Sequence, residues 1–146
     1  MRLAVDASVL VAEALRVRGR RLLANPSLDL FVADEAWDET QHELSRRVAL
    51  LVERGRLEAV LAEELLGEVL KTLALGVTRV PAEAYSDQME EAMRRIPHDL
   101  RDAPTVALAM TLGCGIWTAD RDFFGCGVPV WTTETLTLQL GPREGT

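Results

Sequence analysis

Apolar residues recur along this chain in two spacings, as short continuous runs and as longer stretches in which they return every three or four positions. The short runs predict strands at residues 2–6, 29–33, 77–80, 116–118 and 128–131. The longer stretches predict helices at residues 8–24, 35–53, 57–75, 81–95, 103–112 and 133–140, with a short turn or helix at residues 121–124. Because strands alternate with helices, the pattern indicates a parallel sheet that is covered on both faces.

The length of 146 residues fits one domain with one core. We expect this domain at residues 1–140, followed by a flexible tail at residues 141–146. No apolar run approaches the roughly 20 residues of a membrane span. The first residues, MRLAVD, carry a charge inside the apolar stretch and do not resemble a secretory signal. The cytoplasm is therefore the expected compartment.

The net charge of −7 argues against a protein that coats nucleic acid in general, because such a protein would be basic. The positive charge is nearly all arginine, however, with Lys71 as the single lysine. Arginine suits bidentate contacts with phosphate, and part of the negative charge could be gathered in one metal site. Net charge therefore leaves nucleic-acid binding open.

Cysteine and histidine do not form a zinc-binding pattern. Cys114 and Cys126 make no C-x-x-C pair, and both His42 and His98 lie far from them in sequence. Two free thiols are expected, with a disulfide left open for a hyperthermophilic source. His42 follows Glu39 by three positions, but a Glu-x-x-His metal site needs a second copy on another helix, and the sequence has none. We therefore expect His42 at the surface.

Three aspartates are predicted at the carboxyl edge of the sheet, where open α/β sheets bind their ligands. Asp6 and Asp120 follow strands, and Asp102 begins a helix that leads into a parallel strand. Any one of them alone could simply cap a helix. Converging carboxylates would repel one another unless a hard divalent cation such as Mg²⁺ or Mn²⁺ were bound among them. Such sites commonly catalyse phosphodiester hydrolysis.

A fourth carboxylate could come from the helix predicted at residues 35–53. Glu35, Glu39 and Glu43 lie four residues apart along one flank of its apolar stripe. A solvated acidic face is the usual explanation for such spacing. Periodicity alone does not decide which of the three, if any, turns inward.

Three segments, LAVDASVL at residues 3–10, RDAPTVALAM at residues 101–110 and IWTADRDF at residues 116–123, occur in the order typical of PIN domains. Over residues 1–131 the chain resembles this family, which includes the toxin nucleases of VapBC-type toxin–antitoxin pairs. The resemblance implies a three-layer α/β/α fold with a central parallel sheet. It also implies a metal-dependent endoribonuclease that uses Mg²⁺ or Mn²⁺.

The resemblance also implies roles for individual residues. The catalytic and metal-binding residues that it implies are Asp6, Glu39, Asp102 and Asp120, with Asp122 as a further metal ligand. Ser8 and Thr118 would orient the aspartates. The chain departs from the family at Asp34, where proline is common, and Glu35, Asp38 and Glu43 compete with Glu39 for its role.

RNA is the expected partner, and an antitoxin protein and a second copy of the chain are left open as further partners. Arginines that could contact RNA or an antitoxin, or simply form a salt-bridged surface, are Arg16, Arg18, Arg20, Arg21, Arg46, Arg47, Arg94, Arg95 and Arg101. A catalytically weak PIN-like binding module is the alternative function. A flavodoxin-like phosphotransfer or hydrolase domain is disfavoured, because it needs a lysine at a late strand end and Lys71 lies within a helix.

Overall fold

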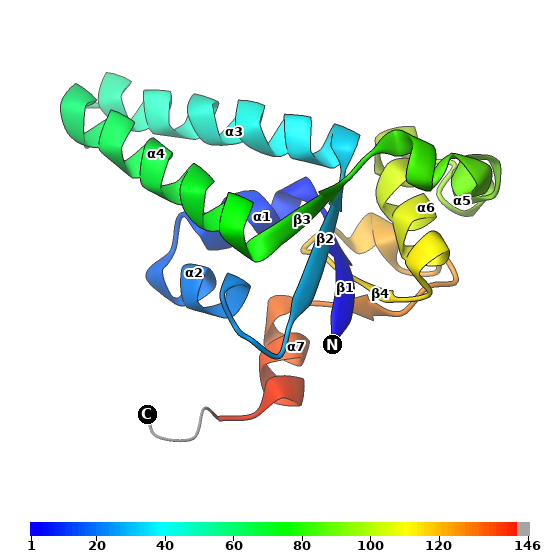
Figure 1. The fold of residues 1–146 in the computed structure, drawn as a ribbon. Helices are drawn as coiled ribbons and strands as arrows, with labels where there is room; N and C mark the ends of the chain where they lie inside the picture. The colour runs from blue at the N-terminus through cyan, green and yellow to red at the C-terminus, as the bar shows by residue number, and fades with distance from the viewer. Residues whose placement is uncertain (143–146) are drawn as a thin grey trace.

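Five parallel strands form the central sheet within residues 1–142, the part of the chain that the computed structural model describes. Their order is β3–β2–β1–β4–β5 (Figure 1). The strands are β1 (Arg2–Val5), β2 (Asp29–Ala33), β3 (Val77–Val80), β4 (Gly115–Trp117) and β5 (Val130–Trp131). The expected flexible tail at residues 141–146 lies, from residue 143 onward, outside the described residues.

Helices cover both faces of this sheet. They are α1 (Ala7–Ala14), α2 (Val17–Leu23), α3 (Asp34–Glu53), α4 (Ala59–Gly76), α5 (Met89–Arg95), α6 (Ala103–Leu112) and α7 (Thr133–Leu140). Short 3₁₀ turns are η1 (Ala82–Ala84), η2 (Ser86–Gln88), η3 (Leu100–Asp102) and η4 (Arg121–Phe123). Figure 1 shows α5 and α6 on one side of the sheet and α1, α2 and α7 on the other, while α3 and α4 pair and extend beyond it. The predicted three-layer α/β/α fold is confirmed.

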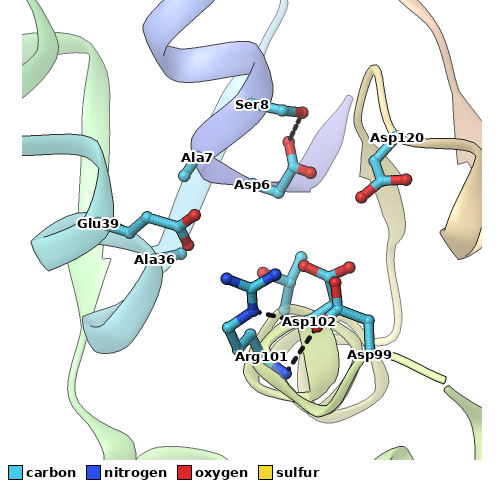
Figure 2. A pocket seen from close by; sticks show the side chains of 10 residues that line it. Asp6, Ala7, Ser8, Ala36, Glu39, Asp99, Arg101, Asp102 and Asp120 are labelled. Atoms are coloured by element: carbon cyan, nitrogen blue, oxygen red, sulfur yellow. Dashed lines mark hydrogen bonds and ion pairs between the residues drawn. The ribbon is translucent and has the colours of Figure 1, made fainter. Parts of the chain in front are cut away.

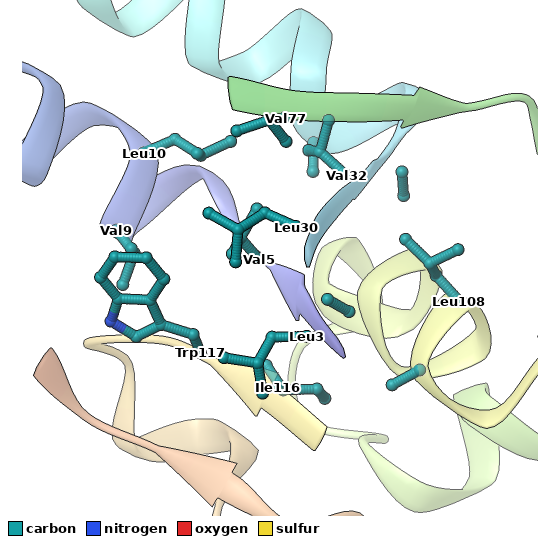
Figure 3. Packing of buried hydrophobic residues seen from close by; sticks show 14 of the residues in the cluster. Leu3, Val5, Val9, Leu10, Leu30, Val32, Val77, Leu108, Ile116 and Trp117 are labelled. Carbon is teal, nitrogen blue, oxygen red and sulfur yellow. The ribbon is translucent and has the colours of Figure 1, made fainter. Parts of the chain in front are cut away.

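The core is continuous across the sheet because the central strands are buried on both faces. Leu3 and Ile116 are almost fully buried at the middle of the sheet, and Leu108 from α6 packs on one side of it (Figure 3). Trp117 is fully buried beside Val9 of α1, and its indole N–H donates to a threonine hydroxyl of α7. Side chains from three layers thus hold the carboxyl ends of β1 and β4 in fixed positions.

The single helix predicted at residues 8–24 is wrong, because the chain turns between α1 and α2. Arg16 adopts extended backbone angles, φ −113° and ψ 142°, which end one helix and begin the next. The turn folds α2 back against the end of α1, so that a Cβ at Gly19 would lie 2.1 Å from the carbonyl oxygen of Glu13. The absence of a side chain at Gly19 permits this close approach.

The helix predicted at residues 81–95 is also only partly present. Two 3₁₀ turns, η1 and η2, occupy its first half, and only α5 is α-helical. Tyr85, between the two turns, is 1% exposed, and burial of its side chain accompanies this tighter winding.

The last strand is shorter than the predicted range 128–131 and begins only after Pro129. Proline lacks the backbone N–H of a paired strand residue.

Replacing Gly19 by alanine should therefore destabilise the protein, by about 1–3 kcal/mol, because the new methyl group forces α2 away from α1. Gly67 offers a matched control, since it lies within α4 and a Cβ there would have no neighbour within 4 Å. Gly67→Ala should stabilise the helix by about 0.5–1 kcal/mol. Urea unfolding measures both changes, and a Gly19→Ala protein as stable as the wild type would contradict the close packing of α2 against α1.

Candidate metal centre and active site

A small cleft of about 110 Å³ lies at the carboxyl edge of β1 and β4 (Figure 2). We call it the acidic cleft, and its charged lining residues are Asp6, Glu39, Asp99, Arg101, Asp102 and Asp120. Parallel pairing of β1 with β4, in which Val5 lies opposite Trp117, brings the ends of these strands together. The structure thus places all four sequence-predicted acids around one cleft. Their functional roles stay predictions.

Asp6 is the most buried acid of the acidic cleft, with 5% exposure, and it also caps α1. Its Oδ1 atom accepts hydrogen bonds from the Ser8 hydroxyl at 2.8 Å and the Val9 N–H at 3.2 Å. Its Oδ2 atom accepts from the Thr118 hydroxyl at 2.6 Å. Burial raises the pKa of Asp6 to about 6, although these three hydrogen bonds oppose the rise.

Thr118 links Asp6 to the acids that follow β4. While its hydroxyl donates to Asp6, the same oxygen accepts from the Asp120 N–H at 2.9 Å. Asp120 in turn accepts from the Asp122 N–H at 2.9 Å through Oδ1. One threonine hydroxyl therefore fixes the spacing between two of the predicted metal ligands.

Asp102 carries a buried carboxylate oxygen, Oδ2, that no hydrogen bond stabilises among the described residues. It stands at the start of α6. Burial, followed by the charges of Asp99, Asp120, Asp6 and Glu39, raises the pKa of Asp102 to about 7. A buried carboxylate oxygen without a donor is costly unless a cation or a proton satisfies it.

Asp99 also lines the acidic cleft, although the sequence patterns did not point to it. It offers an oxygen that lies, with one oxygen each from Asp102, Asp120 and Asp122, within a group of four no more than 4.8 Å apart. The signal for it was present in the sequence as Asp-x-x-Asp before an apolar helix. Residues i and i+3 eclipse in a 3₁₀ turn, and η3 brings Asp99 and Asp102 to the same side.

The hydrogen-bond and ion-pair partners of the acids on α3 indicate which of them could act in the acidic cleft. Only Glu39 lines the acidic cleft. Glu35 instead accepts a hydrogen bond from the Tyr85 hydroxyl, and Asp38 lies 3.5 Å from the guanidinium of Arg79. Glu43 pairs with two arginines of its own helix, at 2.6 and 3.2 Å, and these hold its pKa at about 2. The geometry favours Glu39 as the fourth acid.

Most of the arginines noted in the sequence lie away from the acidic cleft. Arg46 and Arg47 pair with Glu43, and Arg94 and Arg95 pair with Glu91, as expected of a salt-bridged surface. Arg20 donates to a backbone carbonyl at the end of α1. Arg16, Arg18 and Arg21 line a separate hollow of about 1040 Å³ between α2 and α7. Arg101, whose side chain is 85% exposed, is the arginine on the rim of the cleft.

The histidines and cysteines make no metal centre of their own within the described residues. His42 is exposed on α3, as expected. His98 has its Nε2 atom 3.1 Å from the backbone carbonyl oxygen of Asp122 and 3.9 Å from the carboxylate. Cys114 and Cys126 are both free thiols.

Comparison with known proteins now identifies the fold family, since the sequence profile of the PIN domain matches residues 4–141. The chain belongs to the PIN domain family. No curated protein matches the chain. Within residues 1–142, none of the helices combines the length and the apolar character required to cross a membrane.

Three solved structures are similar to this PIN domain. PAE2754 from Pyrobaculum aerophilum is 20% identical, with 96% of this chain and 89% of that chain covered and a TM-score of 0.65. VapC20 from Mycobacterium tuberculosis, a toxin that cleaves the sarcin–ricin loop, is 19% identical, with 86% and 95% covered and a TM-score of 0.53. FitAcB from Neisseria gonorrhoeae is 25% identical, with 90% and 96% covered and a TM-score of 0.52. At 20% and 19% identity, the first two show the fold alone.

The raised pKa values predict that the metal-free protein loses stability as the pH rises. An aspartate in the unfolded chain has a pKa near 3.9, whereas burial raises the pKa of Asp6 to about 6 and that of Asp102 to about 7 in the fold. Between these values the unfolded state binds fewer protons, so the free energy of unfolding falls with rising pH until about pH 7.

Asp102→Asn should flatten this dependence and stabilise the metal-free protein at pH 8. Asp102 is the appropriate position because its Oδ2 atom has no hydrogen bond to lose among the described residues, whereas Asp6 accepts three. Since solvent screens the partly exposed Asp102, we expect a gain of about 1 kcal/mol, or about 2–4 °C in Tm. Thermal unfolding in EDTA at pH 5 and pH 8 measures this shift in Tm. Asp87→Asn, which replaces an exposed aspartate, is the control. A lower Tm for Asp102→Asn at pH 8 would contradict carboxylate crowding.

Proposed function

We propose that this PIN domain is a metal-dependent endoribonuclease and that it acts in the cytoplasm as the toxin of a toxin–antitoxin pair. The observation that carries the proposal is the acidic cleft, where Asp102 lies among further carboxylates and its buried Oδ2 atom has no hydrogen-bond partner among the described residues. PIN domains are typically nucleases, and the similar VapC20 is a toxin that cleaves the sarcin–ricin loop. An antitoxin protein is the partner that a toxin role implies.

The residues of the acidic cleft fit a divalent cation. Every candidate ligand is a carboxylate oxygen, and such donor sets favour hard ions such as Mg²⁺ or Mn²⁺ over zinc. The residues that would hold the cation are Asp6, Glu39, Asp102 and Asp120, with Asp122 beside them. A cation would satisfy the Asp102 Oδ2 atom, which has no hydrogen-bond partner among the described residues, and would offset the burial and the carboxylate repulsion that raise the pKa of Asp102.

The chain's own residues would prepare the cleft for a phosphodiester in three ways. The hydroxyls of Ser8 and Thr118 hold the Asp6 carboxylate in one orientation. Thr118 also fixes the backbone at Asp120. Arg101 lies on the rim with an exposed side chain, which can contact an RNA phosphate. When bound, a divalent cation lowers the pKa of a water molecule and stabilises negative charge on the phosphate and the leaving oxygen.

Cleavage of RNA by the purified protein tests the proposal. With a pool of single-stranded and hairpin RNAs of varied sequence, cleavage should require Mg²⁺ or Mn²⁺, stop in EDTA and weaken with added salt, because phosphate contacts release counterions. Asp6→Asn and Asp102→Asn should each lower the rate at least about 100-fold while the protein stays folded by circular dichroism. Glu39→Gln should lower it at least about tenfold.

Glu43→Gln is the matched control for Glu39→Gln, because Glu43 lies on the same helix, pairs with arginines and does not line the acidic cleft. Its cleavage rate should stay within about twofold of the wild type, since loss of a surface ion pair costs little. Full activity of Asp6→Asn would rule out the proposed site. A protein that binds Mn²⁺ but cleaves no RNA of a diverse pool would indicate a binding module instead.

A further inference from the structure

Phe124 is the only aromatic residue within the described residues 1–142 that lies exposed at the surface. It is 57% exposed, whereas its neighbour Phe123 is fully buried in the core. Single apolar residues at a protein surface are common and by themselves indicate no function. Phe124 differs from such residues in its position, because it directly follows η4, the turn that begins at Asp120 of the acidic cleft.

The ring of Phe124 is attached close to the proposed active site. One carboxylate oxygen of Asp122 lies within 4.8 Å of oxygens from Asp102 and Asp120. Two residues of chain span at most about 7 Å, so the Cα atom of Phe124 lies within about 7 Å of the Cα atom of Asp122. In an RNA with its scissile phosphate in the acidic cleft, the nucleotides on either side of that phosphate are therefore the part nearest to this ring.

The loop that carries Phe124 is fixed on both sides. Phe123 is fully buried and Cys126 is 2% exposed. The Phe124 N–H donates to the Arg121 carbonyl oxygen at 3.0 Å, and the Cys126 N–H donates to that of Phe123 at 3.2 Å. The Arg95 guanidinium also donates to the Cys126 carbonyl oxygen, at 3.3 Å. A ring on a backbone held in this way loses little conformational freedom when it binds a ligand.

The acidic cleft itself is too small to hold a base together with a cation and a phosphate, because its volume is about 110 Å³. The bases of an RNA substrate would therefore lie outside the cleft, on the surface around it. Proteins commonly bind unpaired bases there by stacking them on aromatic rings. Phe124 is the ring that this surface offers for such a contact.

Charged side chains around Phe124 favour a nucleotide over an apolar protein segment. Arg121, which begins η4, is exposed, and its side chain forms no hydrogen bond or ion pair with another described residue. Arg101 lies on the rim of the acidic cleft with an exposed side chain. An aromatic ring beside free guanidinium groups matches a nucleotide, which joins an aromatic base to a phosphate.

We propose that Phe124 stacks on a base next to the scissile phosphate, while Arg121 contacts a phosphate of the same strand. The inference rests on the proposed function and narrows its substrate to RNA that is single-stranded where it is cut, because a base within a duplex has no free face. Since every base has a π-face, Phe124 would strengthen binding with little preference among the four bases. Phe124 is a binding residue and takes no part in the chemical step.

Fluorescence anisotropy of a labelled, short single-stranded RNA of mixed sequence tests this contact without using cleavage. Every protein carries Asp102→Asn, which keeps the RNA intact, and binding is measured in Mg²⁺. Adding Phe124→Ala should raise Kd about tenfold, Phe124→Trp should keep it within about twofold, and Phe124→Leu should not restore it. The Tm should stay unchanged, because the ring is exposed. Leu138→Ala, which removes an 82% exposed side chain on α7, is the matched control and should leave Kd unchanged.

Salt and an RNA analogue without bases separate stacking from phosphate contacts. Arg121→Gln should reduce the slope of log K against log salt concentration by about 0.7, the value of one phosphate contact on a single strand, whereas Phe124→Ala should leave the slope unchanged. An abasic oligomer should bind equally to the proteins with phenylalanine and with alanine at residue 124. With Asp102 intact, Phe124→Ala should raise the KM of RNA cleavage by the same factor as Kd and leave kcat within about threefold.

The inference is overturned if Phe124→Ala changes neither Kd nor KM by more than about twofold, if Phe124→Leu binds as well as the wild type, or if the abasic oligomer shows the same loss. Unchanged RNA binding together with conversion of a dimer to a monomer in analytical ultracentrifugation would assign the ring to an interface between copies instead. RNA cleavage by the wild type alongside any of these results leaves the nuclease proposal intact. Binding that depends on Phe124 without any cleavage by the wild type would support the base contact and overturn the nuclease. Failure of the wild type both to bind and to cleave RNA would overturn both proposals.

Discussion

Parallel pairing of β1 with β4 is the constraint on which the candidate site depends. The register sets Val5 opposite Trp117, so the next residues along each strand, Asp6 and Thr118, meet at the edge of the sheet. Thr118 then holds Asp120 through its backbone N–H. The buried side chains of β1, β4 and the helices on either side keep this edge in place. The cleft thus lies at the ends of two paired strands, with Glu39 supplied by α3 and Asp102 by η3.

The same arrangement makes the cleft electrostatically unfavourable when no cation is bound. Burial raises the pKa of Asp6, and burial together with neighbouring charge raises that of Asp102. The fold tolerates this because hydrogen bonds satisfy both oxygens of Asp6 and because the apolar core beneath the cleft is extensive. A site that binds cations well must hold carboxylates closer together than stability alone would favour. This conflict between cation binding and the stability of the metal-free protein is what the proposed function predicts.

The sequence predicted the fold and most of the acidic cleft because both follow from strand ends. Asp6 and Asp120 could be placed at the carboxyl edge from the alternation of strands and helices alone. The break between α1 and α2 could not be predicted, because the apolar spacing continues through it. Only the close approach of Gly19 to the end of α1 reveals the turn. Glu39 could not be separated from Glu35 by periodicity, because the choice depends on Tyr85, which is distant in sequence. Asp99 was missed because its segment forms a 3₁₀ turn, in which i and i+3 eclipse.

Direct observation of a cation in the acidic cleft tests the central claim of this account, that the clustered carboxylates exist to hold a divalent metal. Crystals of the protein soaked in Mn²⁺ should show an anomalous difference peak within bonding distance of the Asp102 Oδ2 atom, which is buried and unpartnered among the described residues. Further oxygen ligands should come from Asp6 or Asp120. Manganese bound only elsewhere on the surface, with Asp102 still lacking a partner, would contradict the account.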